Sequence, residues 1–290
     1  MAERILVPYD GGEHSRAALA YASGRFPEAE LLVLHVIEPF PDHTRAGGHP
    51  GTKHAAVYER RRALLDDARQ QVDDHRGSVT TDLVYGRTTA ELPRYVERNA
   101  IDEVVMGSRG QEGLANLLLG SVSLAAIRRS PVPVTVVRPD DGGNISPPGS
   151  VLVPFDGSAP ARDALRYAFE QFPDAEVTAL FVYTAANGAS VDIDSEADLE
   201  AAVEREGGGD AGDEHALAAA GRIANRQGRE LNTATAHGDP VHALVRWTDE
   251  HDAEQLVVGR QGYSGVRRFL FGDTTESIVR RSLVPVTVVP

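Results

Sequence analysis

The sequence predicts an α/β protein made of two similar, doubly wound domains, each built on a five-stranded parallel sheet. Short apolar runs alternate with longer amphipathic segments along the 290 residues. Runs such as ILVPY, LLVLHVI and VPVTVV are apolar throughout, as strands buried on both faces of a parallel sheet are. The whole pattern occurs twice, which indicates two copies of one structural unit.

Several segments recur in the same order in both halves. RILVPYDGGEHSRAALAYA near the start matches SVLVPFDGSAPARDALRYA, and ELLVLHVIE matches EVTALFVYT. IDEVVMGSRG matches AEQLVVGRQG, and RRSPVPVTVVRP matches RRSLVPVTVVP. The segment PDDGGNISPPG between the halves is rich in Pro, Gly and Asp, which is typical of a linker. We therefore predict a first domain over residues 1–138, a linker over 139–149 and a second domain over 150–290.

The first copy predicts alternating strands and helices. We expect strands over 4–9, 30–37, 79–85, 102–107 and 132–137, and helices near 13–25, 52–76, 88–99 and 118–129. This order implies right-handed crossovers, and ligands of such sheets bind outside the carboxyl ends of the strands at a topological switch point. In the second copy, residues 184–215 are acidic and rich in small residues, so we expect a flexible, partly helical excursion there.

The composition excludes several classes of function. A formal net charge of −14 argues against a nucleic-acid partner, because phosphate neutralisation needs a basic surface. The absence of Cys excludes disulfides, thiolate catalysis and Cys-based metal sites. The N-terminus lacks the long apolar region of a signal peptide, and the run LANLLLGSVSLAAI is too short and too polar to span a bilayer. We expect a cytoplasmic protein without membrane contact.

The acidic charge is uneven along the chain. Residues 1–145 hold 20 acids and 17 bases, a net charge of −3, whereas residues 146–290 hold 23 acids and 12 bases, a net charge of −11. Lys53 is the one lysine among the 29 basic residues. Either an Arg-biased genome or adaptation to high salt, where an acidic surface stays soluble, explains this composition. The second copy is therefore poorly suited to attracting polyanions.

A glycine-rich loop follows the fourth strand of the first copy, in the segment GSRGQEGLANLLLGS over residues 107–121. Glycines let a backbone approach a ligand closely, and successive N–H groups in such a turn form an anion site. We expect Ser121 to cap the following helix, whose start suits a phosphate group. The pattern is neither a P-loop nor a dinucleotide fingerprint. Taken alone, it is equally typical of a plain strand-to-helix turn.

The spacing Gly-x2-Gly-x9-Gly-Ser resembles the nucleotide-binding signature of the universal stress protein family. VPYDGG, LHV and VPVTVV are similar to that family too, and the likeness covers both halves. The resemblance implies Rossmann-like domains of the adenine nucleotide alpha hydrolase-like kind, which bind ATP, AMP or ADP in some members, with or without Mg²⁺. Members usually pair as dimers. The tandem chain is thus expected to form an intrachain pseudo-dimer, its terminal VPVTVV strands pairing edge to edge, with a further homodimer left open.

Carried over residue by residue, the resemblance implies a binding site in the first copy. Val36 would offer backbone hydrogen bonds and apolar contact to the base, and Arg109 a charge-assisted contact to phosphate. The full set places Pro8, Asp10 and Val36 at the adenine end, Met106 and Gly107 beside the ribose, and Arg109, Gly110, Gly120, Ser121 and Val122 around the phosphates, and it also includes Tyr9.

The second copy keeps a weaker version of the set, at Pro154, Asp156, Val182, Val258, Gly259, Gly262 and Gly272. Its loop ends on Asp273 where the first ends on Ser121. A carboxylate about 4 Å from a phosphate charge costs roughly 4 kcal/mol at an effective dielectric near 20, and the lost hydroxyl contact adds roughly 1 kcal/mol. Arg260, Arg267, Arg268 or a bridging Mg²⁺ would reduce this cost. We predict that the first copy binds ATP and that the second binds it weakly or not at all.

Other chemistry has little support in the sequence. His43, His49 and His54 have no fixed ligand spacing, so we predict no metal site. No nucleophile elbow and no His–carboxylate arrangement occurs, so we predict no catalytic residues. The predicted function is an ATP-binding regulatory protein of the stress response with an unidentified protein partner. A nucleotide-free tandem scaffold and a slow ATP-hydrolysing enzyme remain the alternatives.

Overall fold

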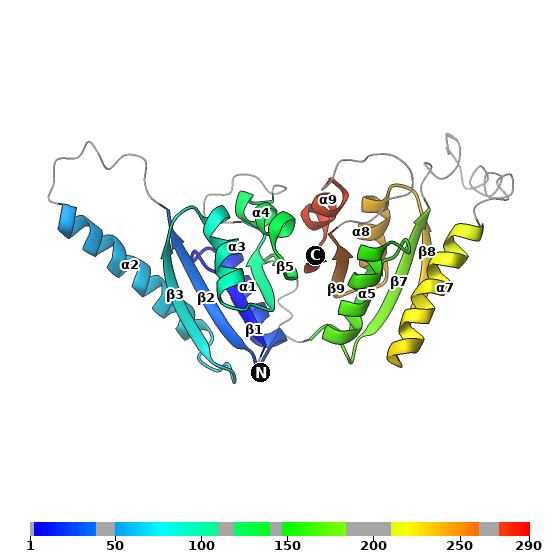
Figure 1. The fold of residues 1–290 in the computed structure, drawn as a ribbon, viewed down its shortest axis with the longest axis horizontal. Helices are drawn as coiled ribbons and strands as arrows, with labels where there is room; N and C mark the ends of the chain where they lie inside the picture. Colours follow the sequence, from blue (N-terminus) through cyan, green and yellow to red (C-terminus); the bar gives the residue numbers. More distant parts are fainter. Residues whose placement is uncertain (1–2, 39–49, 110–118, 140–146, 184–209, 261–272) are drawn as a thin grey trace. The chain divides into compact units, whose positions relative to one another are not determined.

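A computed structural model describes residues 3–38, 50–109, 119–139, 147–183, 210–260 and 273–290. The chain divides into two compact units, Met1–Pro147 and Pro148–Pro290. Each unit is an α/β domain with a parallel sheet and helices between successive strands (Figure 1). The predicted fold class is therefore confirmed.

The first unit has a doubly wound sheet in the order β3-β2-β1-β4-β5, and its strand pairs are parallel. Because the chain leaves β1 in one direction for β2 and later returns on its other side with β4, the switch point lies between β1 and β4. The elements are β1 (Arg4–Pro8), α1 (Glu13–Arg25), β2 (Glu30–Ile37), α2 (Pro50–Gln71), β3 (Val79–Tyr85), α3 (Thr88–Arg98), β4 (Glu103–Gly107), α4 (Ser121–Arg129) and β5 (Val134–Val137).

The second unit repeats this topology in the order β8-β7-β6-β9-β10. Its switch point lies between β6 and β9, which pair in parallel. The elements are β6 (Ser150–Pro154), α5 (Ala159–Gln171), β7 (Glu176–Tyr183), α7 (Asp210–Gln227), β8 (Asn232–His237), α8 (Pro240–Glu250), β9 (Gln255–Gly259), α9 (Asp273–Arg281) and β10 (Val286–Val289).

Several predicted element boundaries were wrong by a few residues. The helix expected over 52–76 ends at Gln71, because turn bonds replace helical ones from Val72 onward. The strand expected over 132–137 begins at Val134, because the Ser130 hydroxyl bonds both the N–H and the carbonyl of residue 132 and so holds a turn there. The helix expected over 118–129 begins at Ser121.

The predicted linker and the predicted acidic excursion lie mostly outside the residues that the structure describes. Residues 140–146 of the linker and 184–209 of the acidic excursion lie outside the described residues, and the end of that excursion begins α7. Edge-to-edge pairing of the terminal strands stays a prediction. None of the helices in the described ranges is long and apolar enough to cross a bilayer.

The strands are buried on both faces, as the continuous apolar runs predicted. In the first unit, Ile5, Val7, Leu31 and Val33 belong to a core cluster with residues of α1 and α2. The neighbouring residues along the same strands, such as Leu6 and Leu32, are also buried and face the opposite side. The matching cluster of the second unit includes Val151, Val153 and Phe155.

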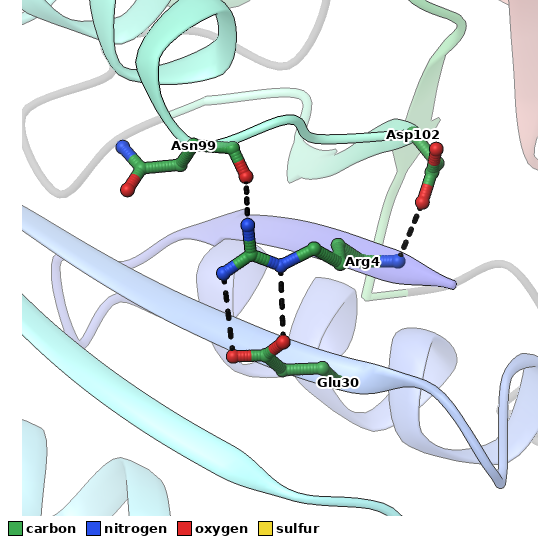
Figure 2. A network of polar contacts seen from close by, with 4 residues as sticks. All are labelled: Arg4, Glu30, Asn99 and Asp102. Atoms are coloured by element: carbon green, nitrogen blue, oxygen red, sulfur yellow. Dashed lines mark hydrogen bonds and ion pairs between the residues drawn. The ribbon is translucent and has the colours of Figure 1, made fainter. Parts of the chain in front are cut away.

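Arg4 fastens the amino-terminal end of β1 to two neighbouring elements (Figure 2). Its Nε lies 3.0 Å from Oε2 of Glu30 on β2, and its guanidinium also donates to the carbonyl of Asn99. Asn99 is the C-cap of α3, so the cation lies where the helix dipole is negative. The Arg4 backbone N–H donates to Oδ2 of Asp102 at 2.8 Å. This network lies at the opposite end of the strands from the switch-point cavity described next.

Candidate functional site

A cavity of about 410 Å³ lies at the carboxyl ends of β1, β2 and β4 in the first unit. Its position is the switch point of the sheet, and its volume suits a small-molecule ligand. It is lined by Pro8, Tyr9, Asp10, Ser15, Leu34, His35, Val36, Thr88, Met106, Gly107, Arg109, Leu119, Gly120, Ser121, Val122 and Ser123.

This lining brings together ten of the eleven residues predicted for the first copy. The remaining one, Gly110, lies outside the described residues. Sequence reasoning missed Ser15, Leu34, His35, Thr88, Leu119 and Ser123. Leu34 could have been found, because alternate strand residues share a face and it lies two positions before Val36. Thr88 could not, since only the three-dimensional fold brings the start of α3 to the cavity.

Asp10 is held in place by the start of α1. Gly11 has a φ of 80°, and the turn it makes lets the Gly12 N–H donate to Oδ1 of Asp10 at 2.9 Å. The Ser15 hydroxyl donates to the same oxygen at 2.7 Å. Two hydrogen bonds to one oxygen atom therefore hold the Asp10 carboxylate at the edge of the cavity.

His35 joins the ends of β1 and β2 beneath the cavity. Its Nδ1 lies 2.7 Å from the carbonyl oxygen of Tyr9, and since a carbonyl only accepts, Nδ1 carries the proton. The side chain is 6% exposed, and this burial lowers the pKa of His35 although the bond to Tyr9 opposes the shift. His35 is therefore neutral at pH 7. The Tyr9 ring belongs to the core cluster with α1 and α2, where burial raises its pKa.

The start of α4 forms the polar end of the cavity. Gly120 is the N-cap, with no side-chain cap bond, and Ser121 is the first helical residue, so the expectation that Ser121 caps the helix was wrong. The Gly120 N–H donates to the carbonyl of Ser108 at 2.8 Å and is therefore not available to a phosphate. Helix geometry leaves the N–H groups of Ser121, Val122 and Ser123 without an acceptor inside the helix. These three amides and Arg109 suit an anion.

Packing requires glycine at position 107 of the first loop but not at position 120. A Cβ at Gly107 would lie 2.7 Å from the backbone of His14, so glycine is required there for α1 to pack on β4. A Cβ at Gly259 would meet Pro160 of the second unit in the same way, at 2.5 Å. At Gly120 an added Cβ would meet its nearest atoms at 3.4 Å. Gly107 and Gly120 are the described glycines of the first loop. Packing therefore explains why position 107 is glycine but not why position 120 is.

The family model of the universal stress proteins matches residues 1–138 and 149–290, which together span almost the whole chain. This chain belongs to the universal stress protein family. A universal stress protein of Mycobacterium tuberculosis is 30% identical over 297 residues, covering 98% of this chain and 96% of the relative. A Thermus aquaticus member is 33% identical over 142 residues, covering 48% of this chain and 100% of the relative. The crystal structure of a universal stress protein from Archaeoglobus fulgidus has a TM-score of 0.66 at 26% identity, covering 99% of this chain and 95% of that one.

The second unit of this universal stress protein keeps the turn but has apolar residues at two of the polar positions. Asp156 accepts from the Ser158 N–H at 2.9 Å, and Gly157 has a φ of 77°, as in the first unit. Ala161 and Phe181 stand where the first unit has Ser15 and His35. Pro154, Val182, Val258 and Gly259 lie at or near the strand ends, whereas Gly262, Gly272 and the side chain of Asp273 lie outside the described part of the chain.

No group of three or more His, Asp or Glu side chains that could hold a metal ion occurs among the described residues. His43 and His49 fall outside them, as does the side chain of His54. Among the residues lining the cavity, Arg109 and Asp10 carry formal charge at pH 7 and His35 is neutral. Phosphate recognition at this site would therefore rest on amides, hydroxyls and one guanidinium.

Proposed function

We propose that this universal stress protein binds an adenine nucleotide in its first unit and acts as a nucleotide-dependent regulator in a stress response. The main support for the proposal is the cavity at the β1–β4 switch point. The start of α4 and Arg109 both line this cavity. Apolar groups from Pro8, Leu34, Val36 and Met106 suit a purine and ribose. The amides of residues 121–123 suit phosphates, with Mg²⁺ as an accessory ion for ATP.

ATP in this proposal is a ligand and not a substrate. Asp10 is the one carboxylate among the described lining residues, and it already accepts from Gly12 and Ser15. Nucleotide that binds the folded first unit stabilises it by mass action and shifts the population of the loop over 107–121. A cytoplasmic partner protein that contacts this loop would then sense whether nucleotide is present.

The direct test is mass spectrometry of ligand released from freshly purified full-length protein, followed by calorimetric titration with ATP, ADP and AMP. We expect one bound adenine nucleotide per chain. Gly120→Ala combined with Ser121→Asp should abolish binding, because the new carboxylate lies beside the phosphate amides. Asp273→Ser should create or strengthen a second, weaker binding event.

The alternatives predict different results. A nucleotide-free scaffold gives no ligand in the mass spectrum and no thermal shift with ATP at millimolar concentration. A slow ATP-hydrolysing enzyme gives several turnovers per chain in a phosphate-release assay. Equal binding to both units, before any substitution, would contradict the proposed difference between Ser121 and Asp273.

A further inference from the structure

Ser108 connects three elements at the end of β4. Its N–H donates to the Val137 carbonyl at 3.0 Å, and its carbonyl accepts from Gly120, the N-cap of α4. Its hydroxyl lies 3.1 Å from Nδ1 of His14 on α1. The residue is 2% exposed and does not line the cavity. It therefore acts on the cavity only through its neighbours.

His14 lies one step further from the cavity, in the first turn of α1. Its backbone packs against Gly107, so its distance from the end of β4 is fixed. The charged groups around its ring are Arg109 and Arg138 from the ends of β4 and β5, and Glu13 and Asp10 from the start of α1. Burial, followed by the Arg109 charge, lowers the pKa of His14, while Glu13 and Asp10 oppose this. The ring is therefore neutral at pH 7 in the free protein.

We propose that Ser108 and His14 are positioning residues for phosphate binding, which hold the start of α4 in place and couple nucleotide binding to protonation of His14. The inference rests on the proposed function. The chain of contacts runs from the His14 ring to the Ser108 hydroxyl, and from the Ser108 carbonyl to the Gly120 N–H. Gly120 in turn sets the direction of the amides at residues 121–123.

The proton coupling follows from Arg109. In the free protein this cation disfavours a proton on His14. A phosphate beside Arg109 offsets its charge, so the protonated ring becomes more favourable when nucleotide is bound. Binding then takes up a proton, and by linkage the affinity contributed by His14 rises as the pH falls.

The second unit shows that the fold does not require this contact. Arg260 occupies the position of Ser108 and still donates its N–H to the Val289 carbonyl at 2.7 Å. Pro160 occupies the position of His14 and cannot make the side-chain bond. The imidazole–hydroxyl pair is thus specific to the unit proposed to bind nucleotide.

The first experiment compares Ser108→Ala with Ser282→Ala in the full chain, using AMP and ATP as probes. Ser282 is a matched control, because it is a buried serine of the second unit whose hydroxyl donates to the Val284 carbonyl. We expect Ser108→Ala to weaken binding about three- to tenfold, as for the loss of one hydrogen bond, and Ser282→Ala to leave it unchanged. Equal effects of the two variants would overturn the proposal.

The second experiment measures AMP affinity from pH 8 to pH 5.5 for the wild type and His14→Gln. Gln can still bond Ser108 but does not titrate. The ratio of the two dissociation constants cancels the titration of AMP itself and of His35. We expect the affinity advantage of the wild type to grow as the pH falls. A ratio that does not vary with pH would refute the coupling.

A third measurement, without nucleotide, separates the inference from the proposed function. Amide hydrogen exchange at Gly120 should be faster in Ser108→Ala than in the wild type or Ser282→Ala. Faster exchange in a protein that binds no AMP or ATP would refute the proposed function while the contact to the start of α4 stands. If the wild type binds AMP or ATP, and Ser108→Ala changes neither the amide exchange at Gly120 nor the nucleotide affinity, the role of Ser108 is refuted.

Discussion

The Ser15 hydroxyl donates a 2.7 Å hydrogen bond to Oδ1 of Asp10, whereas the second unit, which has Asp156 in place of Asp10, has Ala161 in place of Ser15. In the second unit the hydroxyl has moved to the N-cap, where Ser158 accepts from the Ala161 N–H at 3.3 Å. In both units the N-cap N–H of the first helix donates to the aspartate two residues before it, Asp10 in the first and Asp156 in the second. In the first unit, a side chain of α1 thus holds the carboxylate at the edge of the cavity.

Comparing Asp10 with Asp156 separates the effect of these aspartates on stability from the effect of Asp10 on nucleotide binding. We expect Asp156→Ala to lower the free energy of unfolding by about 1 kcal/mol and Asp10→Ala by about 1–2 kcal/mol, because each loses the bond to the N–H two residues on and Asp10 also loses the bond to Ser15. Only Asp10→Ala should also weaken AMP binding, by about tenfold or more. Chemical denaturation and calorimetric titration measure the two effects. Unchanged AMP affinity in Asp10→Ala would contradict a role of this carboxylate in binding.

Alanine at the loop glycines should have opposite effects on stability and binding. Gly107→Ala should lower the free energy of unfolding by about 1–3 kcal/mol, since its Cβ would lie 2.7 Å from the His14 backbone. Gly259→Ala is the matched control and should destabilise the second unit similarly. Gly120→Ala should cost less than about 1 kcal/mol and weaken nucleotide binding, because its methyl group would lie 3.4 Å from the Cα atom of Arg109 and 3.6 Å from Oγ of Ser123, two residues that line the cavity. A stable Gly107→Ala would contradict the packing explanation.

Acid should destabilise the first unit through its buried histidines. The pKa of His35 in the folded protein lies below the unfolded value of 6.5, so the unfolded chain takes up the proton first. Its stability contribution is complete above pH 6.5 and is lost as the pH falls toward the folded pKa. The free energy of unfolding should fall with a slope of up to about 1.4 kcal/mol per pH unit from this group. His35→Phe, which introduces the residue that the second unit has at Phe181, should reduce the slope, and an unchanged slope would assign it to other groups.

The Arg4 network should stabilise the first unit without affecting its cavity. Arg4 and Glu30 are 32% and 29% exposed, so the ion pair is partly screened. Including the bond to the Asn99 carbonyl, we expect Arg4→Met to lower the stability by about 1–2 kcal/mol. Amide hydrogen exchange should accelerate in β1, with β6 as the internal reference. AMP affinity should not change, and a weakened affinity would mean that the two ends of the sheet are coupled.

Salt should distinguish the two explanations of the acidic composition. With a net charge of −14, self-repulsion weakens the folded state, and the screening length falls from about 10 Å at 0.1 M salt to about 3 Å at 1 M. If the charge is an adaptation to high salt, the urea midpoint should rise clearly between 0.1 M and 2 M KCl. A protein that is fully stable without salt would favour an Arg-biased genome.

The fold could be predicted because its signals are local and occur twice. The continuous apolar runs of β1, β2 and β4 indicated their burial on both faces, and the repeat gave each assignment a second test. Boundaries were harder, since α2 ends before Val72 and β5 begins late, after Ser130, through particular turn bonds that periodicity does not reveal.

The candidate site could be predicted as a set of positions but not as a set of contacts. The family signature named most of the residues that line the cavity. It could not show that the Gly120 amide is already bonded, because that bond depends on how β4 and α4 approach each other. Nor could it connect Ser108 to His14, which are 94 residues apart in the chain.

The close packing of α1 on β4, and of α5 on β9, has a consequence for recognising nucleotide-binding sites in sequences. Gly107 and Gly259 are demanded by that approach whether or not a ligand is present. A duplicated copy that no longer binds a ligand would therefore still keep the first glycine of the spacing by which nucleotide binders are recognised. Its presence alone is thus no sign of binding, and the predicted difference between the two units lies instead at the residue that closes the loop, Ser121 or Asp273.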